Sequence, residues 1–166
     1  MIPGTIKIAD HLGVYVIKME GDVRLTLCLS FDEFIDEMLE EPNFSSVIFD
    51  LTDAQAVDST TLGLMAKVSI KSGHHGKESP LVVSSNPSIT RILVSMGFDD
   101  IFRLVDKSEV EDALQSSNES VALTEKNGNE TEVKKRVLEA HKTLMDMNDS
   151  NKATFQELVE TLEAQK

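Results

Sequence analysis

The run Val47-Ile48-Phe49-Asp50-Leu51 is followed after six residues by Asp58-Ser59-Thr60-Thr61-Leu62-Gly63. The first run is short and mostly apolar, which predicts a buried strand. The second opens an amphipathic helix that we expect from Leu62 to about Lys71, because apolar side chains recur there at helical spacing. A strand that leads through a turn into a helix is the building unit of α/β sheets. This stretch therefore predicts an α/β fold.

Asp58 or Ser59 is expected to cap this helix, since a side-chain oxygen there accepts a hydrogen bond from a first-turn amide. A hydroxyl at this place would also tolerate a phosphate, because the free amides and the positive end of the helix dipole favour anions. From these residues alone, a role as a helix cap and a role as a phosphoacceptor both remain open for Ser59.

The first 45 residues predict a hairpin and a helix. Strands are expected at 5–10 and 14–19, joined by a turn at 11–13 and ended by Glu20-Gly21-Asp22. The run 23–29 is a less regular candidate for a third strand. Ser30 and Glu33 match a capping box, which predicts a helix start. One face of that helix is apolar, and its acidic face is expected in solvent: Asp32, Glu33, Asp36, Glu37, Glu40 and Glu41.

Further elements alternate along the chain. Strands are expected at 81–84 and 103–105, and Asn86 with Pro87 marks a helix start. Ser108 with Glu111 is a second capping-box pattern. Gly73 and Gly97 are expected to end two of the helices. The pattern predicts a mixed β-sheet of four to five strands flanked by about four helices.

Residues 57–63 resemble the phosphorylation-site motif of STAS domains, specifically of the anti-sigma-factor antagonists, which reads Asp-Ser-Ser/Thr-Gly-Leu-Gly. The resemblance extends over about residues 5 to 115, with Thr61 in place of the usual Gly. It implies the STAS fold, with Ser59 as the phosphoacceptor. It also implies a set of partner-binding residues: Asp58, Ser59, Thr60, Thr61, Leu62, Gly63 and Asp22.

By this resemblance, the unphosphorylated protein would bind an anti-sigma factor that is also a serine kinase. The kinase would phosphorylate Ser59, and a metal-dependent serine phosphatase would remove the group. Such a protein regulates by binding and is not an enzyme. A STAS domain acting on a different kinase or regulator, for example in motility or biofilm control without a sigma factor, is an alternative that the sequence leaves open.

Composition limits the partners and the compartment. The 166 residues carry a formal net charge of −13, which disfavours direct binding to nucleic acid or to anionic membranes. The single cysteine, Cys28, cannot form an intramolecular disulfide, as is usual in a reducing cytoplasm. The sequence has no signal-peptide pattern and no apolar run of about 18 residues. We therefore expect a cytoplasmic protein.

Other functional classes fit the residues less well. An enzyme or nucleotide-binding domain would need a Gly-rich phosphate loop or a Gly-x-Ser-x-Gly elbow, and neither pattern occurs. A carrier protein with a phosphopantetheine arm on its Asp-Ser would be all-helical, whereas this chain has strand patterns. The adjacent His74 and His75 lack further ligands at metal-binding spacing. We expect no metal and no cofactor.

The last third of the chain is organised differently. We divide the chain into a STAS domain at 1–116, a polar linker at 117–130 and a helical extension at 131–166. Apolar residues of the extension form two seams: Val133, Val137, Ala140, Leu144 and Met147, then Phe155, Leu158, Val159 and Leu162. Two short amphipathic helices are predicted. Their seams must pack within the chain, on a second copy through self-association, or on a partner.

Overall fold

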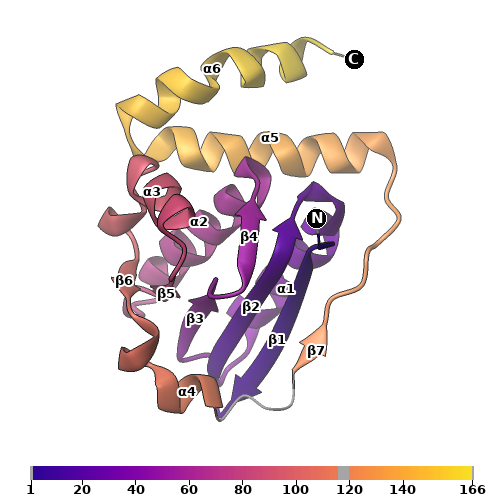
Figure 1. The fold of residues 1–166 in the computed structure, drawn as a ribbon. Coiled ribbons are helices and arrows are strands. Elements are labelled where there is room, and N and C mark those ends of the chain that lie inside the picture. The colour runs from indigo at the N-terminus through magenta and orange to yellow at the C-terminus, as the bar shows by residue number, and fades with distance from the viewer. Residues whose placement is uncertain (1, 116–119, 166) are drawn as a thin grey trace.

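The computed structural model describes residues 2–115 and 120–165. Within them one seven-stranded sheet runs in the order β6-β5-β3-β2-β1-β7, and β4 pairs with β2 off this path (Figure 1). The strands are β1 (Thr5–His11), β2 (Val14–Val23), β3 (Ser46–Asp50), β4 (Ala54–Val57), β5 (Leu81–Val83), β6 (Arg103–Val105) and β7 (Val121–Ala122). The α-helices are α1 (Cys28–Glu40), α2 (Ser59–His74), α3 (Pro87–Ser95), α4 (Glu111–Gln115), α5 (Glu130–Met147) and α6 (Asp149–Ala164).

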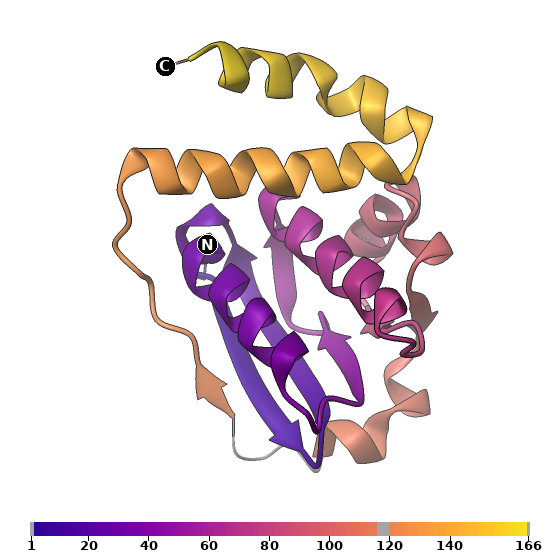
Figure 2. The same ribbon diagram turned by 180° about the vertical axis from the view of Figure 1, so that it is seen from behind.

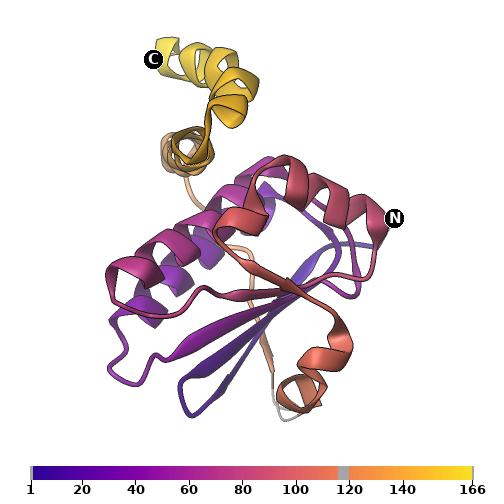
Figure 3. The ribbon, with the colours of Figure 1, turned by 90° about the vertical axis from the view of Figure 1, so that its left-hand side faces the viewer.

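The sheet is mixed, as its connections require. β1 and β2 form an antiparallel hairpin, while β2, β3, β5 and β6 are parallel neighbours joined through helices. Alternate residues of each strand face opposite sides of the sheet. Ile17, Phe49 and Val82 point into the main core beneath α1 and α2, whereas Val16 and Ile48 point into a smaller cluster closed by α4. Figure 3 shows α4 on the opposite side of the sheet from α1 and α2.

The expected α/β architecture is confirmed, but the sheet has more strands than expected. β2 does not end at Glu20. It continues through Gly21, which has a positive φ of 71°, and its register shifts there as it pairs with the unpredicted β4. β4 has only four residues and β7 only two, so neither has enough length to show a clear alternating pattern.

The candidate third strand at 23–29 is wrong. Residues Leu25–Leu27 form a 3-10 helix, and α1 already begins at Cys28. Ser30 therefore lies inside α1 and does not cap it. Its hydroxyl instead donates to the carbonyl oxygen of Thr124, far along the chain. The predicted capping box is wrong because the N-cap of α1 is Leu27, three residues before Ser30.

Two further helix ends differ from expectation. α2 continues through Gly73 to His74, and the glycine with left-handed backbone is Gly76, at φ 72°. Ser108 lies within a 3-10 helix, whose capping box is formed by Asp106 and Glu109. The helix start at Asn86 is confirmed, since its side chain accepts from the amide of Ser88 at 2.9 Å. The left-handed Gly97, at φ 83°, follows the end of α3 as expected.

The two predicted C-terminal helices exist and pack within the chain. α5 lies across the ends of α1 and α2, and α6 folds back on α5 (Figures 1 and 2). Before them β7 extends the sheet by pairing with β1. Residues 117–119 of the predicted linker lie outside the described residues. None of the helices in the described ranges is long and apolar enough to cross a membrane.

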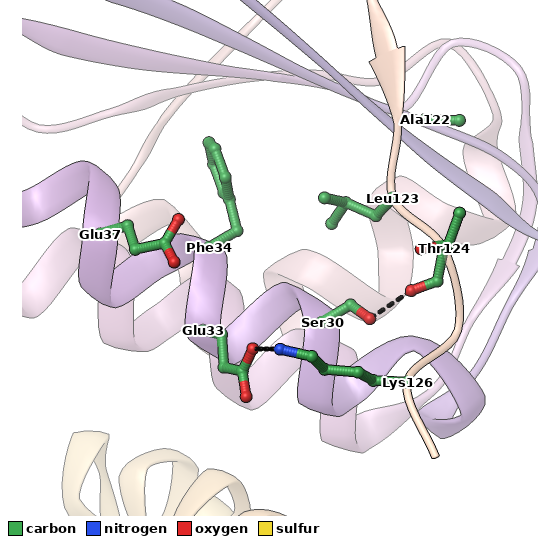
Figure 4. Close-up of a pocket in the computed structure, with 8 residues that line it drawn as sticks. All are labelled: Ser30, Glu33, Phe34, Glu37, Ala122, Leu123, Thr124 and Lys126. Carbon is green, nitrogen blue, oxygen red and sulfur yellow. Dashed lines mark hydrogen bonds and ion pairs between the residues drawn. The ribbon is translucent and has the colours of Figure 1, made fainter.

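The segment after β7 is fastened to the surface of α1, as Figure 4 shows. Leu123 packs against the main core, and its amide donates to the carbonyl oxygen of Ile6 at 2.8 Å. Lys126 forms an ion pair with Glu33 of α1. These contacts lead the chain along α1 and deliver α5 to the far end of the domain.

The tight turn between β1 and β2 gives a test of the fold. Leu12 and Gly13 both have positive φ, 51° and 91°, and a two-residue hairpin loop of this shape favours Asn-Gly. Leu12 is 87% exposed, so the side chain contributes little packing that would offset its strained backbone. We predict that Leu12→Asn raises the free energy of unfolding by about 0.5–1 kcal/mol, measured by urea denaturation.

Gly13 provides the contrasting substitution. A Cβ on Gly13 would overlap the carbonyl oxygen of Asn43 and lie 3.0 Å from its carbonyl carbon. Gly13→Ala should therefore destabilise the protein. Equal denaturation midpoints for wild type and Leu12→Asn would contradict our account of this turn.

Candidate functional site around Ser59

Asp58 fixes the position of the candidate site. Its amide donates to the carbonyl oxygen of Val23 at 3.1 Å, which joins the end of β4 to the end of β2. One carboxylate oxygen accepts from the amide of Thr61 at 2.9 Å and caps α2. The other accepts from the amide of Leu25 at 2.7 Å. Asp58 is therefore the cap, and Ser59 is the first residue of α2.

Ser59 is half-buried beneath α5, where its hydroxyl meets a histidine. The Oγ atom lies 2.8 Å from Nε2 of His141. The other ring nitrogen, Nδ1, lies 2.7 Å from the carbonyl oxygen of Val137. A carbonyl oxygen can only accept, so Nδ1 donates to Val137, and in the tautomer that this bond selects Nε2 is the acceptor for the Ser59 hydroxyl. His141 is 2% exposed, and its ring packs edge-on against Phe155 of α6.

The rest of the motif is also covered. Thr60, Thr61, Leu62 and Gly63 are all buried. α2 and α5 approach closely at Gly63, because a Cβ there would lie 2.6 Å from the carbonyl carbon of Ala140. Only glycine allows this approach of the two backbones.

Asp22 lies on the strand next to the motif. It pairs with Ala56 in the β2–β4 ladder, and its carboxylate accepts from Nε of Arg24 at 2.6 Å. The structure therefore places all seven predicted partner-binding residues on adjoining elements. Their role in binding stays a prediction.

A buried ion cluster joins α1, α2 and α5 beside this region. Asp32, predicted in solvent, is 1% exposed and pairs with Lys67 and with Arg136, the latter at 2.6 Å. Burial alone would lower the pKa of Lys67, but hydrogen bonds to Asp32 and Asp36 outweigh it and raise that pKa. Burial alone would also lower the pKa of Arg136, but the charge of Asp32 and a hydrogen bond to it outweigh burial and raise that pKa. The neighbouring carboxylates thus favour the charged form of both cations.

Cys28 has the environment of a structural thiol. It is buried, and burial raises its pKa, with the negative charges of Asp58 and Asp32 adding to the effect. The thiolate is the nucleophilic form of cysteine, so a raised pKa disfavours reactivity.

The Ser59–His141 pair has only part of the geometry of a catalytic dyad. A hydroxyl that donates to a neutral imidazole is a stronger nucleophile. However, the carbonyl oxygen of Val137, one turn earlier in α5, orients the ring, and in a catalytic triad a carboxylate does so. The ring of His141 is also buried. In the described parts of the chain, no three His, Cys, Asp or Glu residues cluster as metal ligands would. The arrangement fits a packed contact that holds Ser59.

Sequence reasoning missed His141, Ala140 as a contact of Gly63, and Arg136. The predicted seam at 133–147 includes Ala140 but not His141. A polar residue four positions after Val137, on the same face as the seam, was the available signal.

The dual role of Asp58 can be tested by substitution. Asp58→Ala removes the acceptors of two backbone amides, and we expect the free energy of unfolding to fall by about 2 kcal/mol. Asp58→Asn keeps a capping oxygen for Thr61 but places an NH2 donor where the second oxygen accepts from Leu25, so its loss should be about half as large. Urea denaturation gives both values. An Asp58→Ala variant as stable as wild type would contradict this role.

Known proteins share this architecture. A family model described as STAS domain matches residues 5–113. The anti-sigma-F factor antagonist RsfB of Mycobacterium tuberculosis is 32% identical over 110 residues, which cover 66% of this chain and 86% of RsfB.

Two solved structures extend the comparison to the fold. An anti-sigma factor antagonist from Mycobacterium paratuberculosis superposes with a TM-score of 0.53 at 20% identity, covering 70% of this chain and 96% of its own. Unphosphorylated SpoIIAA, also an anti-sigma factor antagonist, gives 0.57 at 12% identity, covering 67% and 96%. At such identities the likeness concerns the fold alone, and the matched part leaves α5 and α6 outside the family model. The family model over residues 5–113 and the 32% identity to RsfB show that the chain belongs to the STAS domain family and, within it, to the anti-sigma factor antagonists.

Proposed function

We propose that this protein is a regulatory binding protein that antagonises an anti-sigma factor and is switched by phosphorylation of Ser59. The observation that carries the proposal is the position of Ser59 as the first residue of a helix capped by Asp58. The relative RsfB is named as an antagonist of the anti-sigma-F factor. That name identifies the class of partner we propose for this chain.

The unphosphorylated protein would bind the anti-sigma factor, itself a serine kinase, through Asp58–Gly63 and Asp22. Ser59 would receive the phosphoryl group from the kinase, and a serine phosphatase would remove it. The protein supplies the acceptor hydroxyl and the surface, and it acts as a substrate and not as an enzyme. Its net charge of −13 favours a basic surface on the partner.

Phosphate at this position changes the surface more than the fold. It adds a charge of about −1.5 to −2 and three acceptor oxygens. The first-turn amides and the helix dipole stabilise such an anion, so α2 can persist. The neighbouring carboxylate of Asp58 adds to the negative field. A surface that fits a neutral hydroxyl would then lose affinity, and a coupling of about 1–3 kcal/mol corresponds to 5–150-fold.

The proposal predicts opposite effects for two substitutions. Ser59→Ala and Ser59→Asp both remove the hydroxyl that donates to His141, but only aspartate adds charge at the helix start. A pull-down from the native lysate, read by mass spectrometry, should recover a partner with Ser59→Ala and lose it with Ser59→Asp. Ser88→Asp is the matched control, because Ser88 is an exposed residue in the first turn of α3.

The identity of the recovered protein decides between two outputs. An anti-sigma factor would support the proposal in full. A different kinase or regulator would place the same switch in another pathway, such as motility or biofilm control. Equal recovery with Ser59→Ala, Ser59→Asp and Ser88→Asp would refute the switch and leave Ser59 as part of a helix start only.

A further inference from the structure

The C-terminal helices lie on the surface that the proposed partner would have to reach. α5 contacts the first turns of α2 and also contacts α1, as Figures 1 and 2 show. His141 takes the hydroxyl of Ser59, and Ala140 lies directly over Gly63. A protein that binds Ser59 and Gly63 from outside would occupy the same space as α5.

We propose that α5 and α6 form a tethered competitor, which covers the Ser59 surface and lifts when the partner or the kinase binds. The inference rests on the proposed function in one respect: that function identifies the partner and the kinase that α5 and α6 would keep from Ser59. The covering itself is a property of this chain and can be measured without any partner.

The docked state is held at a few separate points. Arg136 pairs with the buried Asp32, and His141 pairs with Ser59. At the other end of α5, the side chain of Asn151 donates to the carbonyl oxygen of Met96 at 2.8 Å. These polar contacts add to an apolar contact, because Ala140, Leu144 and Phe155 belong to the main core cluster.

The buried area on α5 is narrow, which suits release. Its buried residues are Ala140, His141 and Leu144, within a helix of 18 residues. Such a stripe gives a helix less hydrophobic stabilisation than the broad apolar face of a core helix such as α1. Asp32 would keep Lys67 as a partner after release, so the ion cluster in the domain is not left uncompensated.

The segment before α5 would keep the released helices close. Lys126 pairs with Glu33, and Ser30 donates to the carbonyl oxygen of Thr124, both on the surface of α1 (Figure 4). A short tether of this kind gives an effective concentration on the order of millimolar. A weak intramolecular contact can therefore compete with a tight external partner.

Phosphorylation and docking would also exclude each other. The Oγ atom of Ser59 has His141 Nε2 at hydrogen-bond distance, 2.8 Å. A phosphoryl group bonded to Oγ would need the space that the imidazole fills. A kinase would likewise need α5 removed before it could place Ser59 in its active site.

Gly63 allows a test with a matched control. A methyl group at Gly63 would clash with the backbone of Ala140, while one at Gly73, in the same helix, meets nothing within 4 Å. Alanine favours helix over glycine at both places. Gly63→Ala should thus release α5 without weakening α2, and Gly73→Ala should not release it.

A second pair of variants acts from α5 itself. Arg136→Glu places a negative charge against Asp32, whereas Lys135→Glu makes the same charge change at an exposed position of the same helix. Neither residue belongs to the predicted partner-binding set. This pair can therefore be used in binding measurements as well as in structural ones.

The experiment compares these four full-length variants with wild type by hydrogen–deuterium exchange. We expect amides of residues 59–63 and 140–146 to exchange about tenfold faster or more in Gly63→Ala and Arg136→Glu. The controls Gly73→Ala and Lys135→Glu should match wild type, and the amides of β3 should stay protected in every variant. If both release variants keep wild-type protection at 59–63 and 140–146, α5 is a fixed part of the domain and the inference is wrong.

Binding then tests the competition. With the purified protein recovered by Ser59→Ala as the probe, Arg136→Glu should bind about 5–150-fold tighter than Lys135→Glu. Equal affinities, with α5 released in Arg136→Glu, would overturn the competitor role. Should no protein distinguish Ser59→Ala from Ser59→Asp, the proposed function fails, while the exchange experiment still decides whether α5 is a releasable cover.

Discussion

The site depends on the two hydrogen bonds that the carboxylate of Asp58 accepts. Two backbone amides donate to this side chain, that of Thr61 at the start of α2 and that of Leu25 after β2. Both would otherwise lack this acceptor. The end of β2, the 3-10 turn and the first turn of α2 are thereby held together. Because Asp58 supplies the cap, the hydroxyl of Ser59 is free to point away from its own helix. A serine that capped α2 itself would have its oxygen committed to a backbone amide.

This arrangement explains why α5 can dock at this place. A free hydroxyl at a helix start is an exposed polar group, and His141 satisfies it with the one nitrogen that its own turn leaves available. Nearby, the absence of a side chain at Gly63 allows the backbone of α5 to come close. The features that would let a partner read Ser59 are the same ones that let the chain cover it.

The sequence was sufficient where the local signal was strong. The hairpin strands, the strand at 47–51 and the Asn86 helix start carry periodicity or caps that depend on few distant contacts. β4 and β7 were not predicted, because their short sequences carry no clear alternating pattern and they form by pairing with neighbouring strands. β4 pairs with the bulged end of β2, and β7 pairs with the edge of β1. Asp32 was assigned to solvent because its two cations lie 35 and 104 residues away. For the same reason the motif indicated Ser59 but not His141, which lies 82 residues further along.

Charge bears on the stability of the docked state. The chain carries −13 overall, and compacting a chain of one sign costs free energy through self-repulsion. The ion pair of Arg136 with Asp32 opposes this repulsion where α5 meets α1. Asp32 is buried and the side chain of Arg136 is 29% exposed, so salt screens this pair less than it screens fully exposed charges. Repulsion between the exposed acids of the domain and those of α5 and α6 is screened by salt. Raising the ionic strength therefore weakens the repulsion between the helices and the domain more than it weakens the ion pair of Arg136 with Asp32. Docking that depends on Arg136 and Asp32 in this way would tighten, rather than weaken, with added salt.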